Sequence, residues 1–195
     1  MTIPVIEAKN IVKSFGGVRA VDNVSVSVMP GEIHAVVGEN GAGKSTLMRT
    51  LAGVETPDSG SVEINGMAIE NSAKASIDAG ISLVHQELSL IPEMTVAENI
   101  MLGSFPTAGG WTKTRDMKKI AADTLKEIGV EVDLDERISR LSVALRQFVE
   151  IARAVARKPK VLILDEPTAT LTPAETDYLL DMLERLASQG LAIIY

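Results

Sequence analysis

Cysteine is absent from this chain of 195 residues. Without a thiol there is no disulfide bond, no nucleophilic thiolate, and no zinc or iron–sulfur centre held by cysteine. The absence is consistent with a cytosolic location, although it does not prove one. The chemistry of this protein therefore has to be sought in other residue types.

Long apolar runs are also missing. The longest strictly apolar runs, such as those at 161–164 and 191–195, have only a handful of residues, whereas a membrane-spanning helix needs about 20. The N-terminal segment MTIPVIEAKN has neither the basic region nor the apolar stretch of a secretory signal. We therefore expect any link to a membrane to come through a partner.

Basic residues are too few for a generic nucleic-acid-binding surface. Lys and Arg number 19 and Asp and Glu number 26, which gives a net charge of −7. Because binding to a phosphate backbone relies on clustered basic side chains, we expect no nucleic-acid partner. An acidic chain can still bind an anion locally through backbone amides. The length suffices for one globular domain and is marginal for two.

The first third of the chain predicts strands. Valines alternate with polar residues over 23–28, the two-residue period of a half-buried strand. Asn65-Gly66 between two short apolar segments is typical of a hairpin with a type I′ turn. Further strands are predicted at 33–37, 81–84, 161–164 and 191–195, and helices at 45–52, 95–102, 115–128, 145–157 and 173–188.

A glycine-rich segment follows the predicted strand at 33–37. Residues 38–45, GENGAGKS, fit the pattern G-x-x-x-x-G-K-[ST] of a phosphate-binding loop, and a predicted helix follows them. Glycines let the backbone approach an anion, and the amides at the start of the helix bind its oxygens. We expect Lys44 to reach the β- and γ-phosphates of ATP and Ser45 to bind Mg²⁺. The alternative is a glycine-rich turn with an exposed lysine. The predicted nucleotide-binding residues here are Gly38, Glu39, Asn40, Gly41, Ala42, Gly43, Lys44, Ser45 and Thr46.

Two carboxylates follow the apolar run at 161–164. Asp165 and Glu166 would lie at the C-terminal edge of a buried strand, where open α/β sheets bind ligands. We expect Asp165 to hold Mg²⁺, directly or through water, and Glu166 to act as the base for an attacking water. The alternative is a surface acidic pair that precedes a proline turn.

Four segments then identify a family by their order and spacing. GENGAGKST, LVHQELSL, LSVALRQFVEIARA and VLILDEPTATLT resemble the motifs of an ATP-binding-cassette (ABC) ATPase domain, over about residues 5–195. KSFGGVRAV, MTVAENIMLG and EPTATLT resemble the ATPase subunits of bacterial monosaccharide importers of the ribose, galactose and xylose type. In that family two cassettes are usually fused in tandem, and this chain resembles the first.

The resemblance implies an α/β fold of the P-loop NTPase class. Its core sheet would be mostly parallel, with an antiparallel β subdomain near the N-terminus and a helical subdomain inserted at about 87–158. Residues 1–195 would form one ABC ATPase domain that is incomplete at its C-terminal end. The family's histidine beyond the strand that starts at Leu191 would then lie outside the chain.

The resemblance also assigns site residues. Phe15 matches the aromatic residue that stacks on adenine, its alternative being an ordinary core phenylalanine. Gln86 matches the glutamine that contacts Mg²⁺ and the attacking water and links the site to the membrane subunits, its alternative being a polar strand end. The implied catalytic residues are Glu166, Gln86 and Lys44.

The signature segment departs from the family pattern. Residues 141–145 read Leu-Ser-Val-Ala-Leu, where the family usually has Leu-Ser-Gly-Gly-Gln. The family uses this loop to cap the γ-phosphate of the opposite subunit, and Ser142 is the matching serine. Val143 is stiff and bulky, so we expect a weakened contact, for which Arg146 and Gln147 are candidates to compensate.

The implied function is ATP hydrolysis, with ATP and Mg²⁺ bound, that powers import of a sugar. The implied partners are transmembrane permease subunits, a second cassette (fused, or a homodimer, head to tail) and, indirectly, a periplasmic sugar-binding protein. The protein would lie in the cytoplasm, peripheral on the inner face of the cell membrane.

One alternative is a truncated nucleotide-binding module with little or no ATPase activity. An ABC protein that acts on DNA or ribosomes fits the acidic charge less well, and no Asn-Lys-x-Asp motif supports a GTPase.

Overall fold

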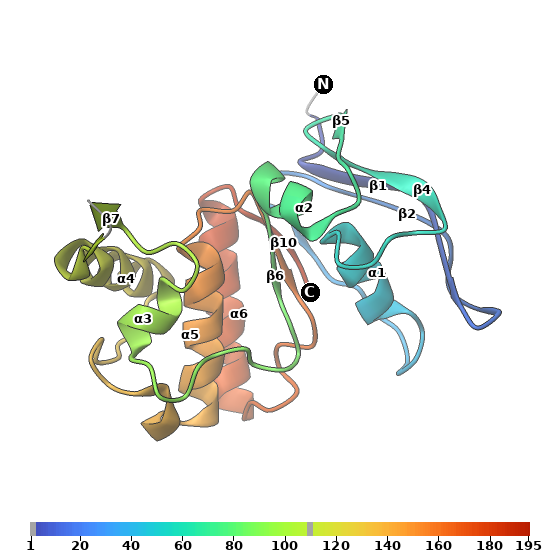
Figure 1. Ribbon diagram of the computed structural model, residues 1–195. Coiled ribbons are helices and arrows are strands. Elements are labelled where there is room, and N and C mark those ends of the chain that lie inside the picture. Colours follow the sequence, from blue (N-terminus) through green and yellow to red (C-terminus); the bar gives the residue numbers. More distant parts are fainter. Residues whose placement is uncertain (1–2, 109–110) are drawn as a thin grey trace. The chain divides into compact units, whose positions relative to one another are not determined.

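The computed structural model describes residues 3–108 and 111–195 (Figure 1). The contacts between these residues divide the chain into two compact units. The first unit contains the residues up to Leu83, with Pro159–Asp165 and Leu186–Tyr195. The second unit contains Val84–Lys158 and Glu166–Arg185. The boundary therefore falls between the two carboxylates of the acidic pair.

The first unit contains an antiparallel sheet with the strand order β2-β1-β4-β5. These strands are β1 (Ile6–Phe15), β2 (Val18–Val28), β4 (Ser59–Ile64) and β5 (Met67–Ala68). The β4–β5 turn is formed by Asn65 with φ 50° and Gly66 with φ 75°. Two successive positive φ angles are what a type I′ turn requires, so this hairpin prediction is confirmed.

A second sheet has the order β3-β10-β9-β6 and brings together distant parts of the sequence. Its strands are β3 (Ile33–His34), β6 (Ile81–Val84), β9 (Val161–Leu164) and β10 (Ala192–Ile194). β10 pairs in parallel with both β3 and β9. Every residue of β9 and β10 is buried, as expected for parallel strands covered on both faces.

Two helices belong to the first unit, α1 (Lys44–Leu51) and α2 (Ala73–Ala79). Leu51 of α1 is fully buried and shares one apolar core with Ile11, Ile163 and Ile194. These residues come from both sheets and from α1. The core therefore fixes the start of α1 relative to the end of β9, and this places the phosphate loop.

The second unit is mainly helical. Its elements are α3 (Val96–Ile100), β7 (Thr107–Ala108), β8 (Trp111–Thr112), α4 (Thr114–Ile128), the 3₁₀ turn η1 (Ile138–Arg140) and α5 (Val143–Val155). Helix α6 (Pro173–Ser188) belongs to this unit as far as Arg185. Helices α3, α4 and α5 pack against one another. The rings of Phe148 and Tyr178 contact edge to face, with 5.2 Å between the ring centroids. Among the described residues, no helix is long and apolar enough to cross a membrane.

Most of the predicted elements are confirmed, but the strand predicted at 33–37 is too long. Only Ile33–His34 forms β3, and Val37 is 90% exposed. The chain leaves the sheet there because the glycine-rich loop begins at Gly38. Helix α2 and the short antiparallel pair β7–β8 were not predicted.

Candidate functional site

The phosphate loop, residues 38–45, connects β3 to α1 within the first unit. Gly41 and Gly43 have φ angles of 84° and 88°, a region that side chains with a Cβ rarely adopt. A Cβ on Gly43 would lie 1.9 Å from the carbonyl oxygen of Ala20. Glycine is therefore required at position 43, for both its backbone conformation and its close packing. The residues from Gly38 to Ala42 are exposed, so the loop is open to a ligand.

The Lys44 side chain folds back over this loop. Its Nζ donates hydrogen bonds to the carbonyl oxygens of Gly38 at 2.8 Å and Glu39 at 2.9 Å. Gly43 precedes α1 and gives it no side-chain cap, and the first turn of α1 has no acidic residue. An ammonium group beside a helix N-terminus without a side-chain cap matches the chemistry of an anion such as a nucleotide phosphate.

Ser45 and Asp165 lie together in the first unit. The Ser45 hydroxyl donates a hydrogen bond to Asp165 Oδ1 at 2.8 Å, and the Asp165 residue is 3% exposed. A hydroxyl and a carboxylate are oxygen ligands that suit Mg²⁺. No group of three or more His, Cys, Asp or Glu side chains in the described part of the chain is placed to hold a metal ion. A cation at this pair would therefore need further ligands, such as phosphate oxygens or water.

Gln86 and Glu166 lie together in the second unit. Gln86 follows β6, and its Nε2 donates a hydrogen bond to Glu166 Oε2 at 2.8 Å. Glu166 has a φ of 49°, the left-handed conformation that is uncommon outside glycine and is often associated with functional sites. Both residues are exposed. The structure thus joins two predicted catalytic side chains that are far apart in the sequence.

Phe15 ends β1 and is 47% exposed. Lys13 Nζ lies 5.1 Å from the centre of the ring. The turn to β2 consists of Gly16 and Gly17, both with positive φ. The alternative of a core phenylalanine is therefore wrong, and the ring has a surface that a flat ligand can reach.

Ser142 is the N-cap of α5, and its hydroxyl accepts a hydrogen bond from the Leu145 amide at 3.2 Å. Val143 is 51% exposed beside it. Arg146 donates to the carbonyls of Ile138 and Ser139, each at 3.0 Å. Gln147 is 5% exposed. Arg146 is thus hydrogen-bonded to backbone carbonyls and Gln147 is buried, and their compensation for the missing signature residues stays a prediction.

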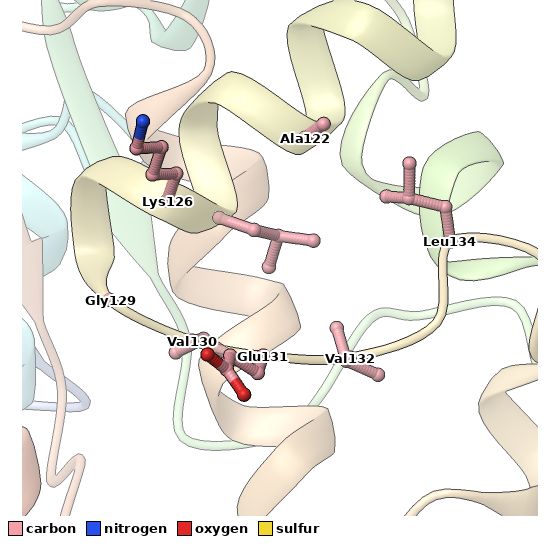
Figure 2. Close-up of a pocket in the computed structure, with 8 residues that line it drawn as sticks. Ala122, Lys126, Gly129, Val130, Glu131, Val132 and Leu134 are labelled. Atoms are coloured by element: carbon pink, nitrogen blue, oxygen red, sulfur yellow. The ribbon is translucent and has the colours of Figure 1, made fainter.

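A pocket of about 540 Å³ lies in the second unit, at the end of α4 (Figure 2). Its lining is mainly apolar, with Lys126 and Glu131 as the charged members. None of the predicted site residues lines it. The complete lining is Ala122, Leu125, Lys126, Gly129, Val130, Glu131, Val132 and Leu134.

Some polar contacts close to the predicted site residues were not anticipated from the sequence. An example is the Lys13–Phe15 contact described above. A further group of contacts joins Ser89 to Glu150 and Arg153 on α5. A glutamate and an arginine three positions apart in the otherwise apolar FVEIARAV stretch were the available signal, but nothing in the sequence indicated Ser89 as their partner.

Comparison with known proteins agrees with this geometry. The family model described as "ABC transporter" matches residues 21–169. Arabinose import ATP-binding protein AraG 1 of Burkholderia cenocepacia is 49% identical over 187 residues, which cover 95% of this chain and 37% of that protein. AraG of Burkholderia pseudomallei is 47% identical with the same coverage. The chain thus spans about 37% of the length of these relatives.

Solved structures give the same fold. A nucleotide-free ATP-binding cassette from an ABC transporter matches with a TM-score of 0.86 and 29% identity, covering 100% of this chain and 80% of that one. The ADP conformation of the cassette MJ1267 matches with a TM-score of 0.86 and 29% identity, covering 99% of this chain and 80% of that one. The chain therefore belongs to the ABC transporter family, and its fold is that of the family's nucleotide-binding ATPase cassettes.

Proposed function

We propose that this chain binds ATP and that, within the complete protein, it hydrolyses ATP to drive the import of a sugar. The observation that carries the proposal is the phosphate loop. Its position 43 admits only glycine, and its Lys44 ammonium lies on the loop beside the N-terminus of α1. This combination matches the chemistry of phosphate binding.

Residues 38–46 would bind the phosphates, and Phe15 would stack on the adenine ring. The exposed fraction of Phe15 supports this role, because a stacking ring needs an accessible face. Ser45, Asp165 and Gln86 would hold Mg²⁺, which supplies charge neutralisation at the phosphates. Mg²⁺ usually binds through one or two carboxylates together with substrate phosphates, which suits this set, in which Asp165 is the one carboxylate.

Glu166 would be the general base. An exposed carboxylate can accept a proton from a water molecule, and the hydrogen bond from Gln86 fixes the direction of one carboxylate oxygen. Gln86 would also orient the attacking water through its remaining amide atoms. Lys44 would stabilise the negative charge that develops on the transferred phosphate.

The complete protein would act as part of a membrane assembly. The names of the arabinose-import relatives support a sugar as the cargo, and their greater length leaves room for a second cassette. Ser142 would then face the nucleotide of that opposite cassette, fused or as a homodimer, in a head-to-tail pair. Transmembrane permease subunits would be direct partners, and a periplasmic sugar-binding protein an indirect one. The cassette would lie on the inner face of the membrane. The comparisons do not favour the alternative of a nucleotide-binding module without turnover.

The test is transport by the complete protein reconstituted with its permease in liposomes. The proposal predicts sugar uptake that requires ATP and is lost, together with ATP hydrolysis, in Lys44→Ala. Uptake that continues in Lys44→Ala, or ATP hydrolysis that is unaffected by it, would contradict the proposal.

A further inference from the structure

We propose that Glu150 and Arg153 of α5 are positioning residues for Gln86, acting through Ser89. The inference rests on the proposed function, because it takes Gln86 as a contact of Mg²⁺. The three residues Ser89, Glu150 and Arg153 are called the Ser89 clamp below. All of them, and Gln86 itself, belong to the second unit.

The Ser89 clamp holds both the backbone and the side chain of one residue. The Ser89 hydroxyl donates to Glu150 Oε1 at 2.8 Å. Arg153 donates from Nη1 to the Ser89 carbonyl at 3.1 Å and from Nη2 to the Ser89 hydroxyl at 2.6 Å. Arg153 Nη2 also lies 2.9 Å from Glu150 Oε1. Ser89 therefore cannot shift relative to α5 without breaking several polar contacts at once.

The two charged members of the clamp are largely shielded from solvent, whereas Ser89 itself is exposed. The side chains of Glu150 and Arg153 are only 5% and 19% exposed. Among the described residues, Glu150 Oε2 is buried and accepts no hydrogen bond. Apolar residues at two such positions often give equal or greater stability than an ion pair, so stability is a poor reason for this pair. Fixing the location of Ser89 is the purpose that the contacts support.

The clamp links two predicted parts of the site. Ser89 is three residues beyond Gln86, which contacts Glu166. Glu150 is eight residues beyond Ser142 on α5, about 12 Å along the helix axis. A helix is a rigid element, so a displacement of its N-terminus reaches Ser89 and then Gln86. The placement of Gln86 would thus depend on α5, the helix that begins at the signature serine.

The experiment measures how Mg²⁺ changes the ATP affinity of the 195-residue chain. The readout is the ratio of the dissociation constant for ATP in EDTA to that in Mg²⁺. We expect Ser89→Ala to lower this ratio by about threefold or more, since groups within one hydrogen-bonded network are energetically coupled. Ser89→Thr keeps a hydroxyl and should restore much of the ratio.

The matched control is Ser104→Ala. Ser104 is also in the second unit, and its hydroxyl donates a single bond to the Met101 carbonyl at 3.3 Å. The variant removes a serine hydroxyl and its one hydrogen bond without touching the clamp, so its ratio should equal that of the wild type. In a Gln86→Ala background, Ser89→Ala should cause no further fall, because the clamp acts through Gln86.

Three outcomes would overturn the inference. The first is an unchanged ratio in Ser89→Ala. The second is that Ser89→Ala lowers the ratio as much in the Gln86→Ala background as in the wild type. The third is a wild-type ratio near one while ATP still binds. The affinity for ATP in EDTA distinguishes failure of the proposed function from failure of this inference. If that affinity is the same in Lys44→Ala as in the wild type, the phosphate-loop proposal itself fails.

Discussion

Gln86 donates a hydrogen bond of 2.8 Å to the carboxylate of Glu166, a residue 80 positions later in the chain. One partner follows strand β6, and the other follows the buried Asp165 at the end of β9. The contact leaves one carboxylate oxygen of Glu166 without this donor, so that oxygen can accept a proton. A glutamine and a glutamate in this arrangement can orient and deprotonate a water molecule.

Glu166→Gln is expected to stop hydrolysis while keeping ATP bound. The amide oxygen can still accept the hydrogen bond from Gln86, but the amide cannot serve as a base. In the complete transporter, we expect turnover to fall by about 100-fold or more, with little change in ATP affinity. Paired turnover and equilibrium-binding measurements check this. Substantial turnover in the variant would show that Glu166 is not the base.

Gly43→Ala is expected to damage the phosphate loop more than Gly41→Ala does. Both glycines have positive φ, but only the Cβ at position 43 would meet the Ala20 carbonyl, at 1.9 Å. Positive φ costs alanine about 1–2 kcal/mol at either position. We expect Gly43→Ala to lower ATP affinity by at least about tenfold and to lower the Tm. Equal Tm and affinity in the two variants would mean that the close packing at position 43 is unimportant.

Asp165→Asn is expected to weaken the dependence of ATP binding on Mg²⁺. The amide oxygen can still accept the hydrogen bond from Ser45, so the local structure is kept, but the negative charge that attracts the cation is lost. ATP affinity should fall by about tenfold or more with Mg²⁺ and stay unchanged in EDTA. Titration calorimetry in the two buffers checks this. A fall in ATP affinity of equal size in EDTA would mean that Asp165 supports the local structure and does not bind the metal.

The start of α6 gives a prediction for pH. The Thr172 backbone amide and, second, its hydroxyl donate to Glu175, and these bonds lower the pKa of Glu175 below its ordinary value of 4.5. Because the pKa is lowered on folding, the stabilisation is present above about pH 4.5 and is lost as the pH falls through the folded value. Glu175→Gln should therefore lower the Tm slightly at pH 7 and have no effect at acidic pH. A Tm difference that persists at acidic pH would contradict this.

Local signals predicted much of the fold from the sequence. Helix α6 has the predicted bounds because Thr172 caps it, Pro173 fixes its first turn, and Gly190, with φ 99°, lies just beyond its end. The strand at 33–37 was predicted too long because apolar residues favour a strand, yet at Val37 the adjoining phosphate loop determines the backbone.

The predictions were weaker for contacts between residues that are far apart in the sequence. Ser89 and Glu150 are 61 positions apart, and no pattern in either segment indicates their contact. The hydrogen bonds of Arg146 to the carbonyls of Ile138 and Ser139, and the burial of Gln147, were likewise not predicted from the sequence. Sequence motifs indicated the candidate site residues, whereas the contacts that place them depend on the folded chain.

The measurement that tests the central proposal most directly is ATP binding by the 195-residue chain and by its Lys44→Ala variant. The matched control is Lys74→Ala, which removes an exposed lysine of α2 that pairs with Asp78 at 2.6 Å. We predict that Lys74→Ala binds ATP like the wild type, and that Lys44→Ala binds at least about tenfold more weakly with an unchanged circular dichroism spectrum. Equal ATP affinity in all three proteins would contradict the assignment of residues 38–46 as the phosphate-binding site.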